Sequence, residues 1–457
     1  MNPSTSTSKL DKFIQNPKKA LWTLSIPMML GMSVQAIYML IDTAFIGKWV
    51  GGSALAGLGL VFPPMFIIMG ITFGLGSGAT TVIAQSIGEK KKEKADNAAE
   101  HIILLGIILS ILFIGIGIFF GDLIIKYQAS NDEVFYHASS YFYTMLYGVF
   151  FMVLSIFFRS ILSGEGDNLL PMKLLGLGTL INLILDPPFI YFYQIKGAAI
   201  ATVLSQVSVF IIFTYLMIFK KHTYITLNLK NFIFDLKIFK KIMKLGVPAS
   251  LSMVIMSIGL FFYNSILNIT EHSVSAIAAY STAHRIEHLF FIPIISMATS
   301  MVTLIGMFYG AKKFNLIKTI IIYCIKSSLL ISLLYGLIFY FLADQIIPIF
   351  INDNESPQVI SFCISYFKIF AFAVPFICIG MIGGRVMQGL GKSYPMFILT
   401  CLRVIIISCS LAWYFIEKLN KPIEFAWIAI LISCISSSII SITWMLFEIK
   451  KTKLQRS

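Results

Sequence analysis

The chain has 457 residues, of which 58% are hydrophobic and 12% charged, and its mean hydropathy is +0.86. Soluble proteins have about a quarter of their residues charged, so this composition excludes a water-soluble enzyme and a disordered protein. The net charge of +14 would suit a nucleic-acid-binding protein, but the positive residues lie between apolar segments, where they set membrane topology. We therefore expect an all-α, polytopic membrane protein that contacts lipid and binds no nucleic acid.

Apolar segments of at least about 20 residues, the length that crosses a bilayer, recur along the whole chain. The basic stretch before residue 20 lacks the apolar core of a signal peptide. We predict twelve membrane spans, at residues 20–47, 54–87, 95–120, 134–162, 168–193, 197–219, 242–268, 273–308, 314–343, 357–388, 393–416 and 424–448.

The distribution of Lys and Arg predicts the orientation of these spans. If the N-terminus lies inside, the inner segments and span ends hold 26 Lys and Arg and the outer segments hold 5. Positive residues concentrate on the cytoplasmic side of membrane proteins. We therefore place both termini in the cytoplasm and the protein in the cytoplasmic membrane.

The two halves of the chain repeat one another at an offset of 221 to 225 residues. Leu24-Ser-Ile-Pro27 matches Leu245-Gly-Val-Pro248, Gly88-Glu-Lys-Lys-Lys92 matches Gly310-Ala-Lys-Lys313, Tyr141-Phe142 matches Tyr366-Phe367, and Gly164-Glu-Gly166 matches Gly389-Leu-Gly391. An even number of spans in each half predicts two six-helix lobes related by a pseudo-two-fold axis along the membrane normal, an arrangement typical of transporters.

This repeat predicts an N-lobe at 1–219, a cytoplasmic linker at 220–241 and a C-lobe at 242–457. Residues 228–243 carry Leu229, Phe232, Ile233, Leu236 and Phe239 among four Lys. That pattern is typical of an amphipathic helix on the inner leaflet.

Ionisable residues inside spans are costly and usually functional, and the first half has two clear cases, Asp42 and Asp186. With Thr202, they lie five to seven residues from the predicted outer ends of their spans, at a common depth of roughly 8–11 Å. Asn182 lies one helical turn before Asp186, on the same face. These hard oxygen groups suit Na⁺ or a shared proton.

Helix-packing hydrogen bonds are the alternative role for these polar residues, above all for Asn182 and Thr202. The repeat argues against that role for the carboxylates, because Asp42 corresponds to about Tyr263 and Asp186 to about Leu411. Pro27 and Pro187 interrupt helix hydrogen bonding beside this set, so they are candidate hinges as well as simple packing bends.

In the second half, Arg285 and Glu287 are candidates for charges that pair inside the bundle or face a cavity. His284, Glu287 and His288 also spell a zinc-hydrolase motif, His-x-x-Glu-His, but no third ligand is evident and the segment is apolar. The six Cys lie in apolar segments without metal-binding spacing. We expect a protein that is not an enzyme.

Several of these segments resemble the multidrug and toxic compound extrusion (MATE) family of transporters. They are Pro27 with Asp42-Thr-Ala-Phe-Ile-Gly47, Asn182-Leu-Ile-Leu-Asp-Pro187, Gly197-Ala-Ala-Ile-Ala-Thr202, Arg285-Ile-Glu287 and Gln388-Gly-Leu-Gly-Lys392. The resemblance spans nearly the whole chain and implies a twelve-helix, two-lobe exporter. In the prokaryotic branch that the sequence most resembles, it implies a cation site at Asp42, Asn182, Asp186 and Thr202.

The resemblance also implies the function. We expect a monomeric antiporter that uses Na⁺ or H⁺, needs no other cofactor, and exports lipophilic or cationic drugs by alternating access. Some relatives carry acidic cation ligands in helices seven and ten, but here span 7 offers only Asn264 and span 10 has no carboxylate. A flippase for lipid-linked precursors, from the same superfamily, is the alternative, and an intramembrane zinc hydrolase is a more remote one.

The predicted topology is testable by labelling. A Cys placed in the 88–94 loop should react with an impermeant reagent only from the cytoplasm, and a Cys at Asn131 only from outside. The charge asymmetry is the reason for this expectation. Labelling of both positions from one side of intact cells would contradict the span assignment.

Overall fold

The computed structural model describes residues 8–129, 131–220, 223–350 and 356–456. Residues 221 and 222 of the predicted linker, and the extreme ends of the chain, lie outside these ranges. Within them the chain forms helices and no strand. The first half contains α1 (Leu10–Gln15), α2 (Pro17–Trp49), α3 (Gly52–Gly88), α4 (Lys92–Gln128), α5 (Asp132–Glu165), α6 (Leu169–Thr214) and η1 (Tyr215–Phe219).

The second half begins with a single 3₁₀ turn and continues with long helices. It contains η2 (Leu229–Asn231), α7 (Leu236–Leu267), α8 (Ser273–Gly310), α9 (Phe314–Phe350), α10 (Pro357–Gly389), α11 (Tyr394–Cys401), η3 (Leu402–Cys409), α12 (Ser410–Trp413), η4 (Tyr414–Lys418) and α13 (Glu424–Arg456). The elements from α11 to η4 follow one another without a break, and together they form one candidate span, Tyr394–Lys418.

Among the described residues, 11 helices are long and apolar enough to cross a membrane. One of them, α6 with its extension η1, includes two of the predicted spans. The backbone leaves helical geometry at Gln194 (φ 52°, ψ −136°), which divides α6 into two arms. Counting the two arms separately recovers the twelve predicted spans, with boundaries that differ by up to eight residues, as at the end of α4.

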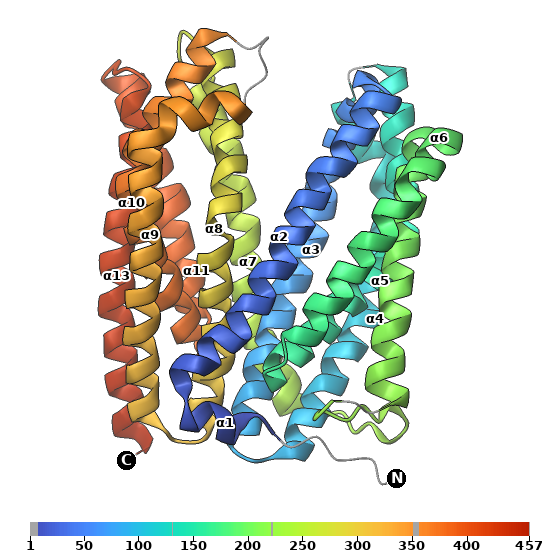
Figure 1. The fold of residues 1–457 in the computed structure, drawn as a ribbon, viewed down its shortest axis with the longest axis vertical. Helices are drawn as coiled ribbons and strands as arrows, with labels where there is room; N and C mark the ends of the chain where they lie inside the picture. The colour runs from blue at the N-terminus through green and yellow to red at the C-terminus, as the bar shows by residue number, and fades with distance from the viewer. Residues whose placement is uncertain (1–7, 130, 221–222, 351–355, 457) are drawn as a thin grey trace. The chain divides into compact units, whose positions relative to one another are not determined.

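Contacts divide the chain into two units. Unit 1 comprises residues up to Lys12 with Ile26–Ser250, and unit 2 comprises Phe13–Ser25 with Leu251 onward. In unit 1, α5 packs against α3, α4 and α6, and in unit 2, α10 packs against α8, α9 and α13 (Figure 1). The repeat matches α5 to α10, so each unit is built around the same central helix.

The turns also repeat. Lys90 and Lys312 both have φ 58°, Gly166 and Gly391 have φ 86° and 90°, and Gln194 and Asn420 have φ 52° and 48°. The members of each pair are 222 to 226 residues apart. Positive φ is uncommon outside glycine, so three pairs of turns with matching positive φ confirm the internal repeat at the level of the backbone.

The two points at which the chain passes from one unit to the other also correspond to each other in the internal repeat. The chain passes from unit 2 to unit 1 between Ser25 and Ile26, just before Pro27 in α2. It returns to unit 2 after Ser250, two residues beyond Pro248 in α7. Proline removes a helix hydrogen bond and so weakens the helix locally. The matched prolines therefore lie where each helix changes unit.

The prediction of an amphipathic helix at residues 228–243 is wrong for the first half of that range. Only Leu229–Asn231 forms a single 3₁₀ turn there, and α7 begins at Leu236. Asp235 caps α7, because its Oδ1 accepts the backbone N–H groups of Lys237 (2.7 Å) and Ile238 (3.3 Å). Side chains of α4 take up several backbone groups of residues 226–235, and apart from the turn at Leu229–Asn231 this segment has no helical structure.

The reversal at Gln194 generates a prediction about Gly197. A Cβ at Gly197 would overlap the backbone carbonyl group of Phe189 on the other arm of α6, and backbone cannot give way as a side chain can. We expect Gly197→Ala to destabilise the fold by roughly 1–3 kcal/mol. A Cβ at Gly176, also in α6, would meet nothing within 4 Å, so Gly176→Ala should be neutral or slightly stabilising. Thermal unfolding of both variants in one detergent checks this, and equal midpoints would contradict it.

Candidate functional site

Asp186 is the centre of a polar cluster in unit 1. It lies on the first arm of α6 and is fully buried. The Asn182 side-chain amide donates to Asp186 Oδ1 at 2.8 Å, and the Tyr38 hydroxyl of α2 donates to Asp186 Oδ2 at 2.9 Å. Both carboxylate oxygens therefore accept a hydrogen bond from a neighbouring side chain, which offsets much of the cost of burying the charge.

Asp42 lies one helical turn after Tyr38 on α2, and its carboxyl interacts with both Tyr38 and Asp186. Its Oδ1 is buried, and the described residues provide that atom with no hydrogen-bond partner. A buried, unpartnered carboxylate oxygen beside a second carboxylate is costly unless a proton or a cation joins the pair. The residues present thus fit the coupling ion that the sequence implies.

Thr202 lies on the second arm of α6. Its hydroxyl donates to the carbonyl of Ala198 in its own helix at 3.0 Å, so it faces the cluster as an acceptor only. Asp186 and Thr202 are each eight residues from Gln194, so the reversal places them at one level, about 12 Å along each arm. The predicted common depth of these two residues follows from the turn.

Sequence reasoning missed two tyrosines of this cluster. Tyr38 has a signal in the sequence, since it precedes Asp42 by four residues and so shares its helix face. Tyr141 of α5 is buried, lies near both carboxylates, and makes hydrogen-bonding contact with Thr202. The internal repeat could have pointed to Tyr141, because Tyr141 corresponds to Tyr366, and Tyr366 also lies beside a buried carboxylate.

That second carboxylate is Glu287 of α8, in unit 2. Tyr366 of α10 donates to Glu287 Oε1, and His284 Nδ1 lies 3.6 Å from Glu287 Oε2. Arg285 is exposed and, two residues earlier on the helix, faces nearly the opposite direction. The two predicted candidates of the second half are therefore not brought together, and only Glu287 belongs to a buried cluster.

The predicted hinge residues lie inside helices, Pro27 in α2 and Pro187 in α6, directly after Asp186. The described residues contain no group of three or more His, Cys, Asp or Glu that could hold a metal ion. His284 and His288 are exposed whereas Glu287 is buried, so the zinc motif does not form one ligand set.

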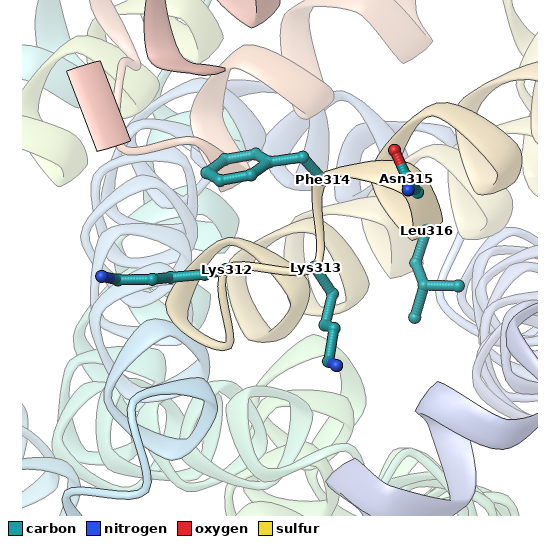
Figure 2. A pocket seen from close by; sticks show the side chains of 5 residues that line it. All are labelled: Lys312, Lys313, Phe314, Asn315 and Leu316. Atoms are coloured by element: carbon teal, nitrogen blue, oxygen red, sulfur yellow. The ribbon is translucent and has the colours of Figure 1, made fainter. Parts of the chain in front are cut away.

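A depression of about 340 Å³ lies at the turn between α8 and α9 (Figure 2). Five consecutive residues line it, Lys312 to Leu316, and two of them are lysines. It is a feature of a single turn and contains none of the buried carboxylates. We therefore assign it no part in the candidate cation site.

A model of the MatE family matches residues 27–187 and 248–414, two segments that begin at the repeat prolines Pro27 and Pro248. The chain belongs to the MATE family. Family members are transporters and not enzymes, so the zinc-hydrolase alternative is wrong. The protein is thus a multi-pass membrane protein of a family that transports small organic molecules and needs no cofactor.

Individual MATE relatives match over nearly the full length. A probable multidrug resistance protein, NorM of Thermotoga maritima, is 25% identical over 441 residues, which are 94% of this chain and 92% of the relative. An outward-facing multidrug resistance MATE transporter of known structure matches with a TM-score of 0.94 and 31% identity, over 98% of this chain and 99% of that one. A transporter of the MOP superfamily from Pyrococcus furiosus gives the same values, and reversed polarity of its binding pocket suggests a different function for it.

The unequal clusters of the two units generate a prediction for transport. Glu287→Gln should reduce drug efflux less than Asp42→Asn or Asp186→Asn, because none of the contacts described for Glu287 is with a second carboxylate that could share an ion, whereas Asp42 lies beside Asp186. Efflux rates of the three variants at matched expression test this expectation. If Glu287→Gln abolished coupling while Asp42→Asn were tolerated, the first-half cluster would not be the coupling site.

Proposed function

We propose that this MATE protein is an antiporter that exports lipophilic or cationic organic molecules in exchange for Na⁺ or H⁺. The observation that supports the proposal best is the pair of the buried Asp186 and the half-buried Asp42, with the buried Oδ1 of Asp42 left without a partner among the described residues. Two adjacent carboxylates in a low-dielectric site cannot both ionise cheaply, so the pair favours binding a proton or a cation.

The cation site of this proposal comprises Asp42, Asn182, Asp186 and Thr202, with Tyr38 and Tyr141 as added positioning residues. Asn182 donates its amide N–H to Asp186 and so keeps its carbonyl oxygen for a cation. Thr202 donates its hydroxyl proton to Ala198, so its hydroxyl oxygen acts as an acceptor and has a lone pair for a cation besides its contact with Tyr141. Carboxylate, amide and hydroxyl oxygens are hard ligands that suit Na⁺.

In the proposed cycle the carboxylate pair takes up the ion when the site opens outward. Neutralising the pair removes the charge repulsion between α2 and α6, so α2 bends near Pro27 and the drug is released. The ion is then carried inward. An inward-negative potential contributes about 2.3 kcal/mol per charge for each 100 mV if the full field is crossed. Pro27 and Pro187 are the proposed hinges.

We further propose a monomer in the cytoplasmic membrane with both termini inside, in keeping with the charge distribution. Export of organic molecules is favoured over flipping of lipid-linked precursors. A flippase needs a cationic groove for phosphate groups, but the cluster described above is acidic. Drug efflux from loaded vesicles under imposed Na⁺ or H⁺ gradients tests the function directly. Efflux that neither gradient accelerates would contradict the antiport proposal.

The charge of the pair should matter for release and not for drug binding. Asp42→Asn should bind drug with nearly unchanged affinity but lose gradient-driven efflux, and Asp186→Asn should do the same. The double variant should be no worse than either single one, as expected of residues that act as a unit. Drug affinity and efflux rate, measured on the same preparations, check these outcomes. Intact gradient-driven efflux in either single variant would contradict the proposal.

A further inference from the structure

The segment that joins the two halves, residues 223–235, is tied to one face of α4 within unit 1. Asp96 holds Thr226 twice, accepting its backbone N–H at 3.0 Å and its hydroxyl at 2.7 Å. Lys92 donates to Asp96 at 2.6 Å and to the Thr226 hydroxyl oxygen at 2.9 Å. This first contact fixes both the path and the rotation of the segment.

Further contacts continue along the same helix. Glu100 accepts the backbone N–H of Asn228 at 2.9 Å, and His101 accepts that of Asp235 at 3.0 Å. Asn97 donates its side-chain amide to the carbonyl of Ile233 at 2.8 Å. Residues 92, 96 and 100 are four apart and share one helix face, and 97 and 101 lie beside them. This row of side chains turns the polar backbone of the segment inward.

Ile225 and Leu227 of the segment are buried, and the Phe234 ring lies 5.1 Å from that of His101 on α4, but four apolar side chains of the segment and of the start of α7 remain exposed. The exposed fractions are 77% for Ile233, 53% for Phe234 and 45% for Leu229, and the neighbouring Leu236 at the start of α7 is 52% exposed. Exposed apolar residues gathered on a short interhelical segment mark a contact surface. We name Leu229, Ile233, Phe234 and Leu236 the linker apolar face.

Positive charge accompanies this face. Lys230, Lys237 and Lys240 are exposed, while Asp235, the only acidic residue from 223 to 240, is engaged in capping α7. The segment also begins and ends at membrane-spanning helices, since the span that contains α6 ends at Phe219 and α7 begins at Leu236. The nearest partner for this face is therefore the lipid of the membrane surface, where apolar acyl chains lie beneath negatively charged headgroups.

We propose that the linker apolar face docks onto the membrane surface and that Lys230, Lys237 and Lys240 bind the headgroups of anionic lipids there. Apolar side chains enter the boundary between headgroups and acyl chains, and lysines near an anionic surface each add about a fivefold preference for it. The hydrogen bonds from α4 hold the backbone of the segment in place while these apolar side chains stay exposed. The inference does not depend on the coupling ion or on the exported molecule.

Fluorescence quenching in nanodiscs tests the docking. The intact protein carries a fluorophore on Ile233→Cys, whose side chain makes none of the contacts with α4, in a Cys401→Ala background, because Cys401 is the one native cysteine that is not buried. A label at Lys90→Cys, on the polar turn after α3, is the matched control. The lipid is phosphatidylcholine with or without phosphatidylglycerol, and a quencher is attached near the lipid headgroup.

We expect quenching at position 233, an increase when phosphatidylglycerol is present, and little quenching at position 90. The triple variant Lys230→Gln, Lys237→Gln and Lys240→Gln should lose the increase that depends on phosphatidylglycerol. The control triple variant Lys312→Gln, Lys313→Gln and Lys318→Gln removes the same charge from exposed sites elsewhere. It should retain the increase in quenching that depends on phosphatidylglycerol. No quenching at position 233, quenching equal in both lipids, or an increase that survives the linker triple variant would overturn the proposal.

Discussion

A charge at the level of the hydrocarbon must find its partners inside its own helix bundle, because neither water nor lipid supplies them. Asp186 meets this requirement with donors from Asn182 and Tyr38. Asp42, one turn from Tyr38, meets it only in part, since its Oδ1 has no partner among the described residues. This imbalance between neighbouring carboxylates on α2 and α6 is the physical basis of the proposed ion site.

Much of the architecture could be predicted from the sequence because a bilayer imposes simple rules of length and charge. Twelve spans and the internal repeat required only apolar length and matching motifs, and the paired turns at Lys90 and Lys312 confirm the repeat. The pairing of Asn182 with Asp186 followed from helical spacing. Tyr38 and Tyr141 were missed because a tyrosine in an apolar span is normally a core or interfacial residue, and only its neighbours in space show otherwise.

The linker shows why periodicity alone was insufficient outside the spans. Its apolar and basic residues have the composition of an amphipathic helix, but a helix over 228–243 would need the backbone N–H of Asp235 and the carbonyl of Ile233 for its own hydrogen bonds. His101 accepts that N–H and Asn97 donates to that carbonyl instead, while Asp96 and Glu100 hold the residues just before. The competing acceptors lie more than 120 residues earlier in the chain, so no local pattern could reveal them. The apolar residues remain exposed all the same.

The reversal at Gln194 makes the first-lobe site sensitive to chain length in a way that its composition does not suggest. Asp186 and Thr202 are positioned by counting eight residues along each arm from one turn. One residue inserted between Asp186 and Gln194 would rotate the carboxylate by about 100° around its helix and turn it away from α2. Descendants of this chain can therefore change side chains around the site far more freely than they can gain or lose a residue within this hairpin.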